Sequence, residues 1–371
     1  MSSFKILLAP DKFKGTISAH EVCNALAQGL KESHPEAEIR SVPLADGGDG
    51  TLAVLHAHMT LERIDCETVD PLGRPMQASY LVDEQRAFIE LASASGLVLL
   101  TSEERNPLHT STFGTGLLVK DAIARGKRQI YLLLGGSATN DMGFGIASAL
   151  GVAFSGPQLP AITGGDLGKL ISIRLPAKPM WSGIEFVLLC DVANPLFGPN
   201  GAARVYGKQK GANLEEIEAL DAGMRHASAL LTSSVGRDSS MLPGTGAAGG
   251  IGGGLVPLLG AQMQSGFAAI AHLTELEKQI KWADVVFTGE GQLDSQSFQG
   301  KVVGNILELC AKYAKPCHVI VGRNTLGEEQ ELPSALQSII TLTEIASSMK
   351  QAMEEAPQLL EGIGRAQKLV I

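Results

Sequence analysis

Carboxylate side chains recur where apolar runs end in this sequence, each time close to glycine or proline. Glycine and aspartate also form ordinary turns, but such turns are not confined to the ends of strands. Carboxylate oxygens together with backbone N–H groups suit Mg²⁺ and phosphate groups. The pattern therefore predicts a cleft that handles a metal ion and phosphates. The acids concerned are Asp11, Asp46 with Asp49, Asp141, Asp191, and Glu290 with Asp294.

Within this set, Asp46, Glu290 and Asp294 are the predicted metal ligands, because their glycine-rich loops can adapt around an ion. Several cationic side chains lie nearby in sequence and could offset phosphate charge. They are Lys12, Lys14, Arg204, Lys208, Lys210 and Lys301.

Asp191 is the predicted catalytic carboxylate. It directly follows Glu185–Leu189, an apolar run that predicts a buried strand, so a rigid element fixes its position. Pro195 holds Asn194 extended. A carboxylate placed in this way can orient an acceptor hydroxyl and take its proton during phosphoryl transfer. An Asx turn, in which Asp191 bonds its own backbone, is the structural alternative.

Glycine-rich segments are the predicted phosphate-binding elements. Gly135–Asn140 follows the apolar run Ile130–Leu134, and Gly244–Gly249 matches G-x-G-x-x-G without the strand and the acid of a dinucleotide site. Glycines let a backbone approach a ligand, and helix starts favour anions. A connecting turn and close helix packing are the respective alternatives. No Walker A motif is present. The predicted phosphate-binding residues are Gly244, Gly246, Gly249, Gly250, Gly135 and Gly136.

The elements that position these residues alternate between strand and helix, which predicts α/β architecture. Ser18 and Glu21 form a predicted capping box at the first helix. Between Glu62 and Leu91, short extended segments joined by turns predict antiparallel hairpins and hence a second domain. Gly156–Ser182 is expected to be a surface excursion. The predicted domains are residues 1–60 with 265–371, a doubly wound parallel domain, and residues 61–264, an inserted mixed-sheet α/β domain.

Composition narrows the class of protein. The 371 residues carry a formal net charge of −9 and include 5 cysteines without C-x-x-C spacing. The sequence contains no basic patch of the kind that binds nucleic acid, so we expect no nucleic-acid partner. Residues 239–274 lack charge, but their glycines and prolines argue against a membrane span. The free cysteines and the early first strand predict a cytoplasmic protein that binds no membrane.

The residues resemble those of the bacterial glycerate kinases of the glycerate 2-kinase type. The resemblance extends over essentially the whole chain. It rests on Ala9–Gly15, Ala45–Thr51, Leu134–Asp141, Cys190–Pro195 with Phe197–Ala212, Gly244–Gly254, and Thr288–Asp294 with Gly300 and Lys301.

This resemblance implies ATP-dependent phosphorylation of D-glycerate with Mg²⁺, with 2-phosphoglycerate favoured over 3-phosphoglycerate, in a cleft between two domains. It implies that the first domain is Rossmann-like and that the inserted domain is restriction-endonuclease-like. The protein is expected to be a monomer or homodimer. By this resemblance, Lys14 is the predicted catalytic cation, in addition to the predicted catalytic carboxylate Asp191. Asp46, Asn194, Ser137 and Asn140 are the predicted substrate-binding residues. A non-catalytic sugar-acid sensor is the alternative from another class, and a phosphatase or nicotinamide oxidoreductase is a more distant one.

Overall fold

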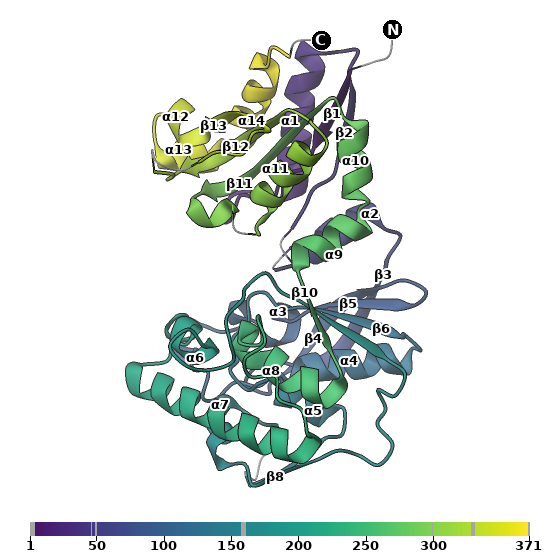
Figure 1. The fold of residues 1–371 in the computed structure, drawn as a ribbon, viewed down its shortest axis with the longest axis vertical. Helices are drawn as coiled ribbons and strands as arrows, with labels where there is room; N and C mark the ends of the chain where they lie inside the picture. The colour runs from purple at the N-terminus through teal and green to yellow at the C-terminus, as the bar shows by residue number, and fades with distance from the viewer. Residues whose placement is uncertain are drawn as a thin grey trace. The chain divides into compact units, whose positions relative to one another are not determined.

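In the computed structural model, residues 4–45, 47–48, 50–156, 161–298, 300–327 and 331–369 are described (Figure 1). The chain divides into two compact units. Unit 1 comprises Met1–Asp46, Ala53–His58 and Phe267–Ile371, and unit 2 comprises Gly47–Leu52 and Met59–Gly266. Unit 2 is therefore inserted, in sequence, between the two main segments of unit 1.

Unit 1 contains a sheet of parallel strands in the order β13-β12-β11-β1-β2. Ile6, Leu7 and Leu8 of β1 are buried, as expected for a parallel strand with both faces covered. β1 pairs with β2 on one side and with β11, almost 280 residues later in the chain, on the other. The strands are β1 (Lys5–Leu8), β2 (Glu38–Ser41), β11 (Val285–Leu293), β12 (Cys317–Asn324) and β13 (Leu336–Thr341).

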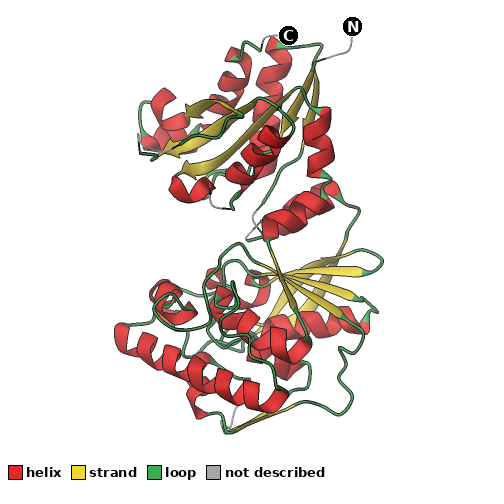
Figure 2. Ribbon diagram, in the orientation of Figure 1, coloured by secondary structure: helices red, strands yellow, loops and turns green. Residues whose placement is uncertain are grey.

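Helices flank this sheet within unit 1 (Figure 2). The predicted capping box is confirmed: the Ser18 hydroxyl accepts a hydrogen bond from the Glu21 N–H, and the Glu21 carboxylate accepts one from the Ser18 N–H. α1 packs against α14, and a side chain at Gly29 would collide with the carbonyl oxygen of Glu361. The helices in or bordering unit 1 are α1 (Ala19–Ser33), α2 (Thr51–His58), α9 (Gly266–Leu273), α10 (Leu276–Trp282), α11 (Val302–Lys312), α12 (Leu342–Ile345), α13 (Met349–Glu354) and α14 (Ala356–Ala366).

Unit 2 contains a mixed sheet in the order β10-β9-β6-β5-β4-β3. β3, β4 and β5 are antiparallel neighbours, whereas β5, β6, β9 and β10 run parallel. The two sheets confirm the predicted fold class, a parallel α/β domain combined with a mixed-sheet α/β domain. The strands are β3 (Glu62–Val69), β4 (Pro75–Val82), β5 (Arg86–Glu90), β6 (Gln129–Leu133), β9 (Glu185–Leu189) and β10 (Gln262–Gln264).

The remaining elements of unit 2 surround one large core. A separate pair of short strands, β7 (Ala153–Ser155) and β8 (Ser172–Arg174), is antiparallel. The helices are α3 (Ala92–Ser95), α4 (Phe113–Ala124), α5 (Phe144–Ala149), α6 (Ala202–Tyr206), α7 (Leu214–Val235) and α8 (Ala247–Leu259), with 3-10 turns η1 (Leu97–Leu99), η2 (Ser102–Glu104), η3 (Gly164–Lys169) and η4 (Lys208–Lys210).

The expectation of a surface excursion at Gly156–Ser182 is wrong. Ile162, Leu167 and Trp181 are buried in the core of unit 2. Glycine in this segment allows close packing instead, since a Cβ at Gly164 would lie 2.3 Å from the carbonyl oxygen of Pro107. Among the described residues, none of the helices combines the length and the apolar character that crossing a membrane requires.

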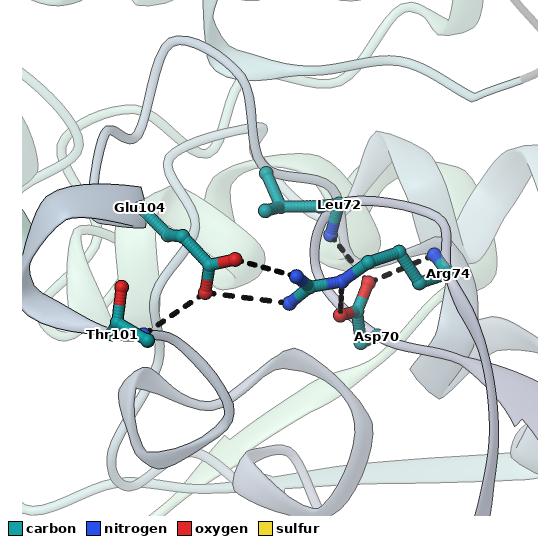
Figure 3. A network of polar contacts seen from close by, with 5 residues as sticks. All are labelled: Asp70, Leu72, Arg74, Thr101 and Glu104. Atoms are coloured by element: carbon teal, nitrogen blue, oxygen red, sulfur yellow. Dashed lines mark hydrogen bonds and ion pairs between the residues drawn. The ribbon is translucent and has the colours of Figure 1, made fainter.

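An ion-pair network fastens the turn between β3 and β4 to the η2 turn (Figure 3). Asp70 accepts hydrogen bonds from the backbone N–H groups of Leu72 and Arg74, each at 2.9 Å. The Arg74 guanidinium bridges Asp70 and Glu104, with a contact of 2.5 Å to each carboxylate. Glu104 also accepts from the Thr101 N–H at 3.0 Å. The long β5–α4 connection is thereby held at its midpoint.

Candidate active site

A cavity of about 580 Å³ lies at the carboxyl edge of the unit 1 sheet. In open α/β sheets this edge is where ligands bind. The predicted residues Lys14, Glu290 and Asp294 all line it, so the structure brings these three together. The charged lining residues are Asp11, Lys12, Lys14, Glu290, Asp294, Lys301 and Arg323.

Glu290 is held by a strand, and its expected place in an adaptable glycine-rich loop is wrong. The apolar run ends at Phe287, but β11 continues to Leu293. It continues because its residues stay paired with β12 as far as Leu293. Glu290 therefore has a backbone fixed by its pairing with Val321 of β12.

Asp294, by contrast, lies in a turn at the end of β11. Its Oδ1 accepts hydrogen bonds from the backbone N–H groups of Gln296, at 2.9 Å, and Ser297, at 3.2 Å. The Nζ of Lys301 lies 4.0 Å from the same oxygen. Asp294 thus stabilises its own turn and also lies near the ammonium group of Lys301, which lines the cavity.

The donor set of this cavity fits Mg²⁺ in its chemistry. Asp11, Glu290 and Asp294 supply carboxylate oxygens, the ligands that Mg²⁺ prefers. Within the described ranges, three or more His, Cys, Asp or Glu side chains do not converge in the manner of a complete metal site. Asp46, the other predicted metal ligand, lies outside the described residues, as does Asp49.

The carboxyl ends of β9 and β10 position Asp191 in unit 2. Oδ1 of Asp191 accepts a hydrogen bond of 2.7 Å from the hydroxyl of Ser265. Ser265 follows β10, which pairs in parallel with β9, so the two side chains emerge at the same edge. Sequence reasoning missed Ser265 because Gln262–Gln264 has no strand pattern.

The loop that follows Asp46 reaches this same edge of unit 2. The backbone N–H of Leu52 donates to Oε1 of Glu90, the last residue of β5, at 3.1 Å. A Cβ at Gly47 would lie 2.7 Å from the Cα of Gly266 and 3.5 Å from the Cβ of Leu189. Glu90 was not among the predicted residues, although its position at a strand end matches the pattern that revealed the others.

Asn194 is held by its neighbours at both ends of its amide. Its Oδ1 accepts from the Tyr206 hydroxyl at 2.7 Å, and its Nδ2 donates to the Asn200 carbonyl at 2.9 Å. Tyr206, at the end of α6, was also missed. Asn194 and Asp191 are three residues apart on one loop, and the predicted role of Asn194 in substrate binding stays a prediction.

Lys210 lies beneath the loop that follows β6. It is only 2% exposed, and its Nζ donates to the Ser137 hydroxyl at 2.8 Å and to the Thr139 carbonyl at 2.7 Å. Burial lowers the pKa of Lys210 to about 7, and the nearby charge of Asp141 partly opposes this shift. A lysine is seldom buried so completely. Its contacts hold Ser137, a predicted substrate-binding residue, in one position.

Asp141 is fully buried, so the expectation that it lines a cleft is wrong. It accepts hydrogen bonds from the Thr112 N–H at 2.8 Å, from the Thr112 hydroxyl at 2.7 Å, and from the N–H groups of Gly143 and Gly145 at 3.2 Å each. Burial raises the pKa of Asp141, while these hydrogen bonds oppose the shift. Its role is to join the β6 loop to the start of α4.

Asn140 is likewise fully buried. Its Nδ2 lies 3.1 Å from the sulfur of Met224. Within the described part of the chain, its Oδ1 and the Thr139 hydroxyl are buried without a hydrogen-bond partner. A substrate would reach Asn140 only if this loop moved, and its predicted role stays a prediction.

Close packing accounts for the glycines of the G-x-G-x-x-G segment. A Cβ at Gly246 would collide with the carbonyl oxygen of Pro195, and one at Gly249 with that of Thr139. Gly249 and Gly250 also have left-handed φ values of +75° and +89°, which distort the start of α8. Gly244 has φ +83° and lies close to the carbonyl oxygen of Val192. Phosphate binding by these residues stays a prediction.

The other predicted phosphate-binding glycines, Gly135 and Gly136, follow β6 directly. Gly136 has φ +66°, and its exposed backbone accepts a hydrogen bond from the Leu97 N–H at 2.9 Å. These residues share the carboxyl edge of unit 2 with Asp191. Charged and polar side chains at the carboxyl ends of the parallel strands in each sheet place the chain in the class of α/β proteins that bind ligands at this edge.

Comparisons with known proteins agree with this class. The model of the glycerate kinase family matches residues 6–369. A glycerate kinase of Halalkalibacterium halodurans is 37% identical over 365 residues, covering 97% of this chain and 96% of that protein. A glycerate 2-kinase of Escherichia coli K12 is 40% identical over 328 residues, covering 86% of this chain and 86% of that protein.

Solved structures include a similar chain. A crystal structure provisionally described as glycerate kinase 2 of Salmonella typhimurium LT2 has a TM-score of 0.83 and 36% identity, and covers 98% of each chain. The present chain belongs to the glycerate kinase family, whose members are enzymes that phosphorylate glycerate. The resemblance inferred from the sequence is thereby confirmed.

Proposed function

We propose that the chain transfers the γ-phosphoryl group of ATP to D-glycerate, with Mg²⁺, and that the O2 hydroxyl is the acceptor. The observation that carries the proposal is the cavity of unit 1, which both carboxylates and cationic side chains line. A magnesium–phosphate complex needs both kinds of group. The name of the Escherichia coli relative, glycerate 2-kinase, supports O2 as the acceptor.

We propose the following residue roles, supported by the contacts of the residues that the structure describes. Asp191, oriented by Ser265, accepts the proton of the acceptor hydroxyl. Lys14 offsets phosphate charge. Ser137, Asn140, Asn194 and Asp46 bind glycerate. Glu290, Asp294 and Asp46 would hold Mg²⁺, which when bound neutralises charge on the phosphate oxygens.

The proposed reaction is tested by phosphorus NMR of the product formed from ATP and D-glycerate. We expect 2-phosphoglycerate, no turnover after chelation of divalent ions, and recovery when Mg²⁺ is restored. Formation of 3-phosphoglycerate would contradict the acceptor assignment alone. Binding of glycerate without any product would support the sensor alternative. The predicted reaction cleft between two domains stays a prediction, tested by scattering profiles with and without ATP analogue and glycerate.

A further inference from the structure

The cavity of unit 1 changes character along the edge of the sheet. The strand order β13-β12-β11-β1 separates the residues that follow β13 from those that follow β1. α12 and α13, which follow β13, contribute Leu342, Met349 and Met353. The segment after β1 contributes Lys12 and Lys14. One cavity therefore has an apolar end and a charged end.

The apolar end exposes two methionines on one face of α13. Met349 is 47% exposed and Met353 is 44% exposed, and they lie four positions apart, so they are neighbours on the helix. A single exposed apolar residue needs no explanation. A pair that lines a cavity beside the buried Leu342 does, because it offers a continuous apolar surface. Thioethers pack favourably against aromatic rings, so this surface fits a planar base.

The charged end combines a cation with the start of a helix. Lys301 is the N-cap residue of α11, an 11-residue helix, and it lines the same cavity. N–H groups at a helix start favour a phosphate, and a lysine adds positive charge. Lys14, from the segment after β1, is exposed and lines the cavity as well. The volume of about 580 Å³ lies in the usual range for small-molecule sites.

We infer that this cavity is the nucleotide site, with the base of a nucleoside triphosphate on Met349, Met353 and Leu342 and its phosphates at Lys14 and Lys301. The inference rests on the proposed use of ATP. It places the nucleotide in unit 1, whereas the glycine pattern of the sequence placed the phosphates on segments of unit 2. Packing of Gly246 and Gly249 against protein backbone accounts for the glycines of that segment without a nucleotide.

Binding of two different probes tests the apolar end and the charged end of the cavity separately. A fluorescent ATP analogue requires both ends, whereas inorganic tripolyphosphate requires only the cationic end. The double variant Met349→Ser, Met353→Ser should weaken binding of the ATP analogue about tenfold. Its affinity for tripolyphosphate and its KM for glycerate should stay unchanged. Lys301→Met should weaken both the analogue and tripolyphosphate.

Met180→Ser is the matched control, since Met180 is 41% exposed but lies in unit 2. Thermal unfolding checks that each variant is folded. Unchanged binding of the ATP analogue by the double methionine variant, or an equal loss in the control, would overturn the inference. An equal loss of tripolyphosphate binding in the methionine variant would also overturn it. If the proposed reaction itself is wrong, the wild-type protein will form no phosphoglycerate from ATP and D-glycerate. This outcome is distinct from the binding results that test the nucleotide site.

Discussion

The ammonium group of Lys210 donates a hydrogen bond of 2.8 Å to the hydroxyl of Ser137. The oxygen of Ser137 is the acceptor in this contact, so its own hydrogen can be donated to another group. Lys210 also donates to the Thr139 carbonyl at 2.7 Å. A single buried side chain thus fixes both the backbone and the hydroxyl of the loop that follows β6.

We expect the buried Lys210 to make the free energy of unfolding depend on pH. The pKa of Lys210 is lowered to about 7 from 10.5, and Asp141 is the nearby charge that opposes the shift. Between these pKa values the unfolded chain binds one more proton at this residue, so Lys210 makes stability rise with pH. Lys210→Met should remove that contribution. Urea unfolding between pH 7 and 8.5 measures it, and the exposed neighbour Lys208 provides the control Lys208→Met. Parallel slopes for wild type and Lys210→Met would contradict the prediction.

Asp191→Asn tests the catalytic carboxylate. The amide keeps the size of the side chain and can still accept from Ser265, but it cannot take a proton. We expect kcat to fall about 10²–10⁴-fold, the usual range for general acid–base groups, with Tm nearly unchanged. Ser265→Ala removes the orienting hydrogen bond and should lower kcat by at most about tenfold.

The exposed acid Asp65 on β3 provides the control, because Asp65→Asn should leave kcat unaltered. Steady-state kinetics with glycerate and ATP, together with thermal unfolding, measure these effects. Near-normal kcat in Asp191→Asn would remove Asp191 from the mechanism and make Asp46 or Asp294 the next candidate.

Gly249→Ala should destabilise unit 2 more than a glycine substitution of the same backbone type elsewhere. The φ of +75° costs about 1–2 kcal/mol for any residue with a Cβ. The new methyl group would also collide with the Thr139 carbonyl. Gly260 has φ +71° and open space around it, so Gly260→Ala measures the backbone cost alone. Equal losses of unfolding free energy in the two variants would show that the Thr139 contact relaxes freely.

Arg74→Met should lower Tm more than Arg63→Met. Arg74 forms ion pairs with two carboxylates, one of which belongs to the nearly buried Asp70. Arg63 pairs with Asp65, and both of these side chains are exposed to solvent. Exposed pairs contribute little, while a buried carboxylate that loses its cation is costly. Thermal unfolding of the two variants compares these contributions, and an equal effect would show that the network of Figure 3 is no stronger than a surface pair.

Local rules made much of the fold predictable. The capping box of Ser18 and Glu21 depends on residues three apart, so the sequence alone contains it. The buried strand Glu185–Leu189 is fully apolar after its first residue. β10 could not be predicted, because Gln262–Gln264 becomes a strand only through its pairing with β9.

The candidate site was predictable where chemistry follows a strand end. Asp191 and Asp294, which follow β9 and β11, were predicted in this way, and Asp294 lines one cavity with Glu290 and Lys14. Burial was not predictable, since Asp141 has the same local pattern as Asp191 and yet is enclosed. The roles of Ser265 and Tyr206 depend on contacts between segments distant in sequence. Periodicity carries no information about such contacts.

The pairing of β1 with β11, and of α1 with α14, has a consequence during synthesis on the ribosome. The first strand has its β11 partner only after about 285 residues have been translated. Residues 59–266, in contrast, form one continuous compact unit that emerges earlier. Since domains generally fold as units while the chain is made, unit 2 is expected to reach its native structure first. The apolar residues Ile6–Leu8 of the amino-terminal segment therefore remain without their β11 partner until less than a quarter of the chain is left to be translated.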